Sequence, residues 1–307
     1  HHTGEILIDN CTFYRNMCYG SSTESYGGGI VFDSACSSAI IRDTTFQRNQ
    51  AITGHAIYTK SSMSTLRLES GCRFLDNSNG EIGYQICHNG AGIEATGTTI
   101  EYSLVRLHAG GVKIQSKSIS KFTQCTFTYC EIPSEKGGGI SLFATEGSAT
   151  EESIDLDNCI FDKCDSSEGA AFYIDAYELN ASIRGCTFKN HFYGHKIFYL
   201  KYPSFQPFLF EGFTFENNFY KNTATKPEFG GCGIKLDFTP ESITFKDCNF
   251  LRNAADAIGG GIAYTLDIPI TFDHCTFTGN KCNGTYAAAL YLKSTTNVTI
   301  TSTTFEE

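Results

Sequence analysis

The sequence contains no tryptophan and little methionine or proline, with two Met and six Pro among its 307 residues. Runs of helix-forming Ala, Leu, Glu and Lys are also missing, whereas 25 Phe, 16 Tyr and many Thr favour strands. No apolar stretch approaches the roughly 18 residues that a membrane helix needs. These absences indicate a β-rich chain and no direct membrane insertion by this segment.

Positive charge is scarce as well. Lys and Arg number 23 against 33 Asp and Glu, which gives a net charge of −10, and no basic stripe occurs. Nucleic acid is therefore a poor partner, and anionic membrane surfaces are disfavoured for the same reason. The chain has no G-x-S-x-G, P-loop or dinucleotide-binding motif, so we expect no cofactor.

One phrase recurs along the whole chain: a Cys, a Phe two residues later, an Asn three residues after that, and then small residues leading into an Ile. The Phe position repeats at a basic spacing of about 27 residues, with insertions of 6 to 8 residues in three units. Eleven units account for the chain, and no linker divides it, so we expect one domain over residues 1–307. The equivalent positions are Phe13, Phe46, Phe74, Ile100, Phe127, Phe161, Phe188, Phe215, Phe250, Phe277 and Phe305.

Each unit begins with an alternating strand, as in "SITFKDCNF" at residues 242–250. The spacing between Phe245 and Cys248 breaks the period of two, so we expect the chain to bend there. An Asn then closes a turn, where we expect it to tolerate the left-handed conformation and to bond the backbone of the neighbouring coil. These residues are Asn16, Asn49, Asn77, Asn218, Asn253 and Asn280.

A glycine-rich corner leads into a second strand of the unit. It reads GG[GA]I at residues 27–30, 137–140 and 259–262, with relatives GHAI, GAGI, GAAF and AAAL. Glycine suits a tight corner where a Cβ would clash. A unit this short cannot bury its own apolar face, whereas stacked units can. The sequence therefore predicts an all-β fold, a right-handed parallel β-helix of about eleven coils.

The paired Phe-x-x-Asn and glycine-corner motifs resemble the repeat of the chlamydial polymorphic membrane proteins, and related repeats occur in surface proteins of some parasitic protists. The resemblance covers essentially the whole chain, but Cys130, Cys164 and His191 take the Asn position and GGGI often replaces GGAI. It implies a surface-displayed or secreted β-helix that acts in adhesion or as an extracellular scaffold, without catalysis. Its partner would be a host or neighbouring cell-surface protein or glycan, or another copy of itself.

The two chain ends lie within the repeat. "TTNVTITSTTFEE" reads as the strand of a further coil without a polar cap. An uncapped solenoid end exposes a sheet edge. We therefore expect this chain to be a segment of a longer protein.

Half of the fourteen cysteines share one repeat position, where we expect buried free thiols because Cys behaves as a small hydrophobe. A linear stack of single thiolates does not converge on a metal ion, so we expect no metal site. Cys130 and Cys164 instead occupy the turn position in adjacent coils and form a candidate disulfide. The seven stacked cysteines are Cys11, Cys72, Cys125, Cys159, Cys186, Cys248 and Cys275.

A carbohydrate-active β-helix enzyme, related to pectate lyases, is the main alternative. Such enzymes place two or three carboxylates on adjacent coils. Asp247 and Asp273 lie on adjacent coils but at different offsets from their Cys, and with Asp9 and Asp157 they suit turn solvation better than catalysis. A third alternative is an intracellular structural rod, which many free thiols would suit.

Loops and anomalies mark candidate contact surfaces. The insertions fall in coils that contain residues 17–26, 144–153 and 219–229. His191 and His195 have the spacing of a metal-binding pair on a helix, but nothing helical surrounds them, so we expect no metal there. Of four glycosylation sequons, at Asn10, Asn180, Asn283 and Asn297, we place Asn180 and Asn283 in loops. Residues 191–215 are rich in aromatics that either pack inward or form a contact patch. The patch candidates are Phe192, Tyr193, Tyr199, Tyr202, Phe205 and Phe208.

Overall fold

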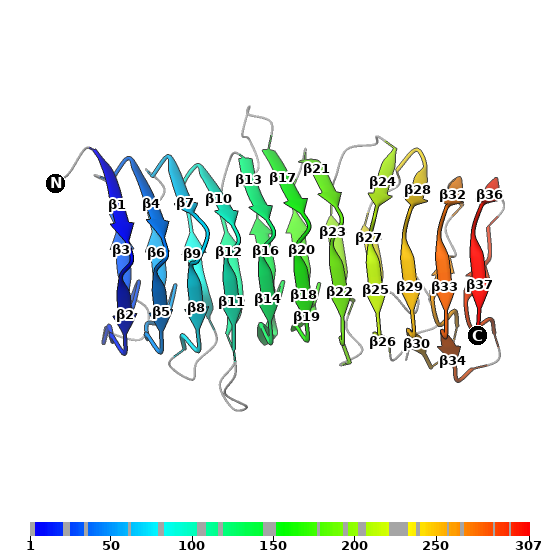
Figure 1. Cartoon of the computed structure of the whole chain (residues 1–307), viewed down its shortest axis with the longest axis horizontal. Coiled ribbons are helices and arrows are strands. Elements are labelled where there is room, and N and C mark those ends of the chain that lie inside the picture. The colour runs from blue at the N-terminus through cyan, green and yellow to red at the C-terminus, as the bar shows by residue number, and fades with distance from the viewer. Residues whose placement is uncertain are drawn as a thin grey trace.

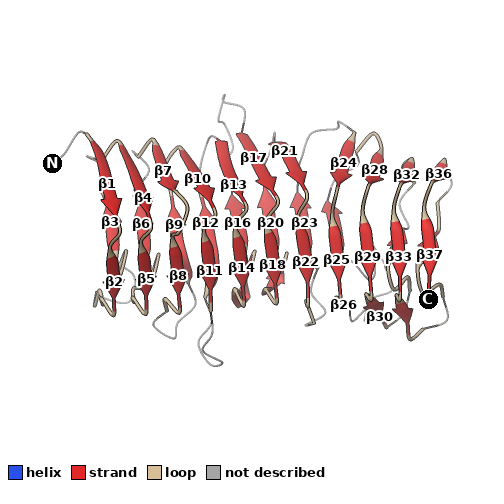
Figure 2. Cartoon of the chain, viewed as in Figure 1, coloured by secondary structure: helices blue, strands red, loops and turns tan. Residues whose placement is uncertain are grey.

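Stacked coils run along the whole molecule (Figure 1). Each coil turns once around a common interior of buried apolar side chains. The described part of the chain contains strands and turns but no helix, and therefore no helix that could cross a membrane (Figure 2). The computed structural model describes residues 4–20, 25–33, 36–60, 63–78, 83–102, 109–115, 119–143, 152–176, 179–192, 196–201, 207–220, 233–237, 240–256, 258–264, 267–284, 286–294 and 296–307.

Two parallel sheets of eleven strands confirm the predicted eleven coils, because each coil contributes one strand to each sheet. Sheet 1 comprises β1 (Glu5–Asp9), β4 (Ser38–Arg42), β7 (Thr65–Leu68), β10 (Gly92–Thr96), β13 (Ile119–Thr123), β17 (Glu152–Asp157), β21 (Leu179–Arg184), β24 (Phe208–Glu211), β28 (Ile243–Lys246), β32 (Ile270–Asp273) and β36 (Val298–Thr301). Sheet 2 comprises β2 (Thr12–Tyr14), β5 (Thr45–Gln47), β8 (Arg73–Leu75), β11 (Thr99–Glu101), β14 (Thr126–Thr128), β18 (Ile160–Asp162), β22 (Thr187–Lys189), β25 (Thr214–Glu216), β29 (Asn249–Leu251), β33 (Thr276–Thr278) and β37 (Thr304–Glu306).

The strands that follow the glycine corners form a third layer, sheet 3. It comprises β3 (Ile30–Phe32), β6 (Ile57–Thr59), β9 (Tyr84–His88), β12 (Gly110–Ile114), β16 (Ile140–Phe143), β20 (Phe172–Asp175), β23 (Phe198–Lys201) and β27 (Ile234–Asp237), while β31 (Ile262–Tyr264) pairs with β35 (Leu290–Leu292). Short strands pair at the turns: β15 (Glu131–Lys136) with β19 (Asp165–Glu168), and β26 (Phe219–Tyr220) with β30 (Ala254–Ala255) and β34 (Lys281–Cys282). The sequence predicted two strands per unit; the structure has three because the bend separates sheets 1 and 2.

A single residue with positive φ makes the corner between sheets 1 and 2. In the ninth coil it is Asp247, at φ 54°, between Phe245 and Cys248, so the predicted bend is confirmed. Asn, Asp and Gly predominate because they tolerate the left-handed conformation best. The corner residues are Asn10, Asp43, Gly71, Gly97, Gln124, Asn158, Gly185, Gly212, Asp247, His274 and Ser302.

The asparagines form hydrogen-bonded ladders inside the stack. The Asn49 Nδ2 donates to Asn77 Oδ1 at 2.9 Å and to the Phe13 carbonyl oxygen at 2.9 Å. The Asn49 Oδ1 accepts from Asn16 Nδ2 at 2.8 Å and from the Asn16 backbone N–H at 3.0 Å. Buried amides are costly unless they are bonded, so these ladders fix the register of successive coils.

The conformation expected for these asparagines was wrong. The residue with positive φ is the one before the Asn, such as Arg15, Arg48 or Arg252. This preceding residue turns the chain outward, and the Asn side chain can then point into the stack. The bonds to the neighbouring coil are confirmed, but the turn conformation belongs to the preceding position.

The Phe row predicted from the repeat is confirmed at every step of sheet 2. Phe46 pairs with Phe13 and Phe74 in register, and its ring stacks on theirs at centroid distances of 4.8 and 4.9 Å. The row continues through Phe277 and Phe305, whose centroids are 5.0 Å apart. Stacking equal side chains at the strand spacing fills the interior without voids.

Most glycine corners lie where they were predicted. Gly137 has φ 71°, and a Cβ on Gly139 would lie 2.5 Å from the Ala171 carbonyl oxygen, so neither position accepts a side chain easily. The GAGI motif at residues 90–93 was assigned wrongly. It leads into β10 of sheet 1, and the corner of that coil lies at residues 109–111, before Val112 of sheet 3.

Candidate functional site

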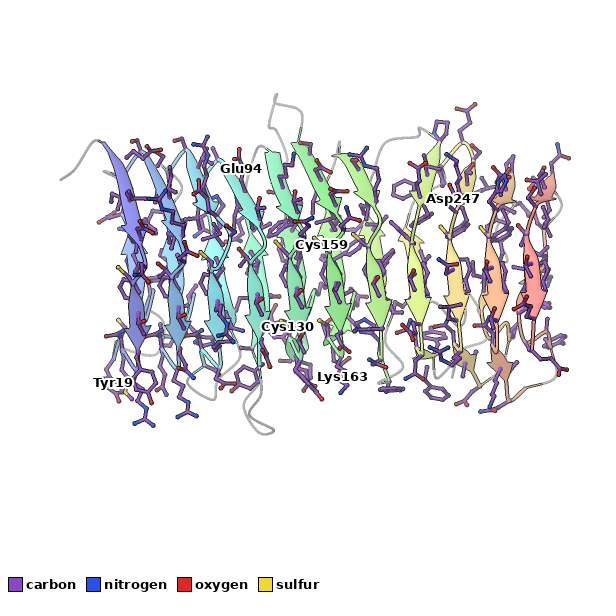
Figure 3. All side chains as sticks on the ribbon, in the orientation of Figure 1. Tyr19, Glu94, Cys130, Cys159, Lys163 and Asp247 are labelled. Carbon is purple, nitrogen blue, oxygen red and sulfur yellow. The ribbon has the colours of Figure 1, made fainter. Side chains whose placement is uncertain are left out.

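The outer face of sheet 1 carries charges that compensate one another between coils. Arg42 bonds Asp9 at 2.9 Å, and Lys246 bonds Glu211 at 2.8 Å. Arg67 likewise bonds Glu94 at 3.2 Å (Figure 3). In-register parallel pairing places these side chains opposite one another, and opposite charges in that position attract. These pairs therefore offset charge between neighbouring coils of the face.

The two aspartates of the enzyme alternative lie on this side of the stack. The Asp273 Oδ1 accepts hydrogen bonds from Thr301 at 2.7 Å and contacts the exposed His274 at 2.9 Å. The hydrogen bond from Thr301 is the main cause that lowers the pKa of Asp273. Asp247 is an exposed corner residue, 3.9 Å from Lys246. These contacts favour local structural roles for both carboxylates.

A cleft of about 350 Å³ lies on the outer face of sheet 3, over the first five coils. Its floor is the outward row of β6, β9 and β12, where Tyr58, Cys87 and Lys113 pair in register. The strand β15 supplies a wall through Ile132 and Glu135. The complete lining is Tyr26, Ile52, Thr53, Gly54, Tyr58, Gly83, Tyr84, Cys87, Asn89, Lys113, Gln115, Ile132 and Glu135.

Three tyrosines give the cleft its aromatic character. The rings of Tyr26 and Tyr58 lie 4.5 Å apart at an angle of 35°, and both side chains are half-buried. Tyr84 is buried, and its hydroxyl donates to the Lys136 carbonyl oxygen, which ties β9 to the wall strand. Burial raises the pKa of Tyr58 and that of Tyr84, so both hydroxyls stay protonated near neutral pH.

Lys113 supplies the positive charge of the cleft. Its Nζ lies 5.6 Å from the centroid of the Tyr84 ring and 5.5 Å from that of Phe143. Aromatic faces attract cations, so both rings hold the ammonium group over the cleft. The neighbouring Cys87 is buried, and desolvation raises its pKa to about 11, which makes this thiol a poor nucleophile.

Sequence reasoning missed this cleft. The signal was present: Tyr58, Cys87 and Lys113 are the outward residues between inward ones such as Ile57, Ile86 and Val112. The alternation of each strand was visible separately, but the repeat was aligned on its interior residues. The outward residues of different coils were therefore never compared as one row.

The cysteine row is largely as predicted. All thirteen described cysteines are free thiols, and six of the seven at the shared position are buried, whereas Cys11 in the first coil is exposed. The hydrogen bond between Cys125 and Cys159, together with burial, raises the pKa of Cys125. The Cys125 thiol is therefore protonated and shielded from solvent.

Cys130, labelled in Figure 3, lies beside Cys164 of the next coil, as the register predicted, and both are free thiols. Both occupy the predicted turn position, directly before β15 and β19, and their side chains face the interior and are buried. Each thiol donates weakly to a backbone carbonyl of the preceding coil, at 3.6 Å in both cases. Burial, reinforced by the Cys164 thiol, raises the pKa of Cys130. The disulfide stays a prediction.

His191 is the third residue that takes the place of the ladder Asn, after Cys130 and Cys164. It is buried, and its Nδ1 lies 2.9 Å from the Cys164 carbonyl oxygen, so it stands in for the missing Asn. His195 lies outside the described residues. Among the residues that the structure describes, no group of three or more His, Cys, Asp or Glu side chains could hold a metal ion.

The structure leaves fewer exposed residues in the aromatic patch predicted at residues 191–215. Phe192 is exposed, but Tyr199 is buried, so its assignment to a contact patch was wrong. Phe208 is partly buried and packs on the core, with its ring 4.9 Å from that of Phe210. The other candidates, Tyr193, Tyr202 and Phe205, lie outside the described residues.

The sequons lie in different settings. Asn180 belongs to β21 and pairs with Ser153, so its predicted loop position was wrong. Asn283 is exposed in a bend after β34, as expected, and Asn297 is exposed before β36. Asn10 is the exposed corner residue of the first coil. Glycosylation at any of them stays a prediction, and much of the insertions at 17–26, 144–153 and 219–229 lies outside the described residues.

Comparison with known families agrees with this architecture. A family model described as a right-handed β-helix region matches residues 28–206 and 156–305. The chain therefore belongs to the right-handed β-helix family. No curated protein and no solved structure matches the chain. The narrower resemblance to the polymorphic membrane proteins stays a prediction.

Proposed function

We propose that this chain is a non-enzymatic β-helix, surface-displayed or secreted, that acts in adhesion or as an extracellular scaffold by binding a glycan. The observation that supports the proposal is the cleft on sheet 3. Its half-buried tyrosine rings offer apolar faces, and Asn89, Gln115 and Glu135 offer polar groups beside them. Apolar walls with a few polar groups are typical of small-ligand sites.

The composition of the cleft favours binding over hydrolysis. Glycosidases generally use two carboxyl groups on either side of the scissile bond, about 5 to 9.5 Å apart. Glu135 is the one carboxylate in the cleft lining within the described part of the chain. On sheet 1, which is another face, Asp9, Glu211 and Asp273 are engaged with cations or hydroxyls of adjacent coils.

The test measures adhesion and turnover on the same preparation. Beads coated with the purified chain should adhere to cells that display the ligand, and soluble glycans should compete. The same protein should release no product from neutral or acidic polysaccharides, with or without Ca²⁺. Turnover that disappears in Glu135→Gln, Asp247→Ala or Asp273→Ala would overturn the proposal in favour of an enzyme.

A further inference from the structure

Lys113 differs from Lys136 of strand β15 and from Lys201 of sheet 3 in how its charge is held. Lys136 Nζ lies 3.0 Å from a Glu168 oxygen, and Lys201 Nζ lies 3.1 Å from an Asp175 oxygen. Within the described part of the chain, Lys113 forms no ion pair, and its contacts are with the rings of Tyr84 and Phe143. An ammonium group that is held by rings, and not by a bonded carboxylate, can still form a charge-assisted hydrogen bond to a ligand.

The surroundings of Lys113 are suited to an anion. Its side chain is half-buried and crosses from the floor of sheet 3 into the cleft. Charge interactions are stronger at such a site than in open water, since less solvent separates the partners. A carboxylate or sulfate placed beside the ammonium would therefore gain a charge-assisted hydrogen bond.

The remaining walls match the other parts of a sugar. The rings of Tyr26 and Tyr58 can take the apolar face of a pyranose. Asn89 and Gln115 offer amide groups to hydroxyls, and Glu135 offers acceptor oxygens. The cleft therefore combines an aromatic platform with neutral hydrogen-bonding groups and one cation. This combination limits the class of ligand that the cleft can bind.

We propose that the cleft binds a sugar unit that carries one anionic group, a carboxylate or a sulfate, with Lys113 as its counter-charge. This inference rests on the proposed glycan-binding function and adds the class of sugar. Glu135 limits the number of anionic groups, because a second negative charge on the same unit would approach this carboxylate. A singly charged unit should therefore be preferred over a neutral or a doubly charged one.

The experiment compares matched ligands. The whole chain is tested on an array that pairs each carboxylated or sulfated oligosaccharide with its neutral parent, and hits are titrated calorimetrically. The acidic member should bind better, and comparing carboxylated with sulfated members shows which group is preferred. Lys113→Gln should weaken acidic binding about tenfold or more and leave neutral binding nearly unchanged. Glu135→Gln should strengthen acidic binding.

The matched control is Lys121→Gln, one coil further on, where Lys121 lies on sheet 1 and faces Asp155 at 3.7 Å. It removes the same charge from another face and should leave binding unchanged. Equal affinity for acidic and neutral partners, or equal effects of Lys113→Gln and Lys121→Gln, would overturn the inference while glycan binding survived. If no glycan binds, the cleft is not a sugar site. If the beads also fail to adhere, the proposed function is wrong as well.

Discussion

The outer faces of sheets 1 and 3 are built by the same stacking rule but differ in what they expose. On sheet 1 the register places Lys246 beside Glu211 and Arg42 beside Asp9, so charge is neutralised within the face. On sheet 3 it places Tyr58, Cys87 and Lys113 in one row beneath a wall strand. The first face is a regular solvated surface, and the second contains a cleft whose lysine forms no ion pair with the residues that the structure describes.

The difference shows where a solenoid can acquire a site. Stacking alone makes flat faces, since equal strands repeat at the strand spacing. The cleft arises where the turns deviate, because β15 and the Tyr26 side chain lie beside sheet 3 and Tyr84 of β9 is bonded to the β15 backbone. Both faces depend on one interior, so changes inside should affect both of them, and changes on one face should not affect the other.

The largest effect should come from a charge in the shared interior. Phe250 is fully buried between Phe215 and Phe277, at centroid distances of 5.3 and 4.5 Å. Phe250→Asp should cost more than about 4 kcal/mol, or abolish folding, because the carboxylate has no partner there. Thermal melting should show both faces lost together, whereas Asn249→Asp, at the outward neighbour, should melt like the parent. A Phe250→Asp protein that melts normally would contradict the common interior.

Acid should weaken the interior next. His55, His88 and His191 are buried as neutral rings, and desolvation lowers the pKa of each from 6.5 to about 4. Unfolded histidines bind protons at higher pH than folded ones, so the stability they confer is complete above about pH 6.5 and falls between 6.5 and 4. Together they should give a slope of up to about 4 kcal/mol per pH unit in denaturant titrations.

The contribution of one histidine to this acid slope can be measured with a single substitution. His191→Asn restores the residue type of the ladder beside Asn218, whose Oδ1 accepts from the residue 191 backbone N–H at 3.1 Å. The variant should keep its stability at neutral pH and lose about a third of the acid slope, roughly 1.4 kcal/mol per pH unit. An unchanged slope in His191→Asn would show that this ring is not neutral and buried.

A smaller effect should follow from breaking one asparagine ladder. The Asn253 Nδ2 donates to the Phe215 carbonyl oxygen at 2.8 Å, and its Oδ1 accepts from Asn218. Asn253→Ala leaves these buried groups without partners and should lower the free energy of unfolding by about 2 to 4 kcal/mol. Asn249→Ala, on the outer side of sheet 2, should change it little. Equal effects of the two alanine variants in chemical denaturation would argue against the ladder as a stabilising element.

The smallest effect should come from a surface charge on sheet 1. It tests directly whether the two faces are independent. Glu211 holds Lys246 by a hydrogen bond that raises the pKa of Lys246, but both groups are exposed. Lys246→Gln should therefore change the melting temperature only slightly, and less at high salt. It should leave the binding of acidic glycans intact, whereas Lys113→Gln should weaken that binding and leave the melting temperature unchanged. A Lys246→Gln variant that loses binding would show that the faces are coupled.

Much of the fold could be read from the repeat because interior positions are constrained every coil. The Phe row, the corner at Asp247 and the glycine corners follow from steric limits that act on local sequence. The predicted positions were wrong where two places in the sequence meet the same steric requirement. GAGI at residues 90–93 has the composition of a corner, and Asn tolerates the left-handed conformation as well as the residue before it does.

The sequence by itself determined the number of coils, the register and the interior rows, because each depends on one repeated unit meeting its own copy. Only the tertiary structure decided that Cys130 and Cys164 face inward, that Tyr199 is buried and that Lys113 stands over Tyr84 and Phe143. These outcomes depend on side chains that come from different coils and on how far each turn rises above its sheet. Such contacts have no period in the sequence, so a repeat cannot reveal them.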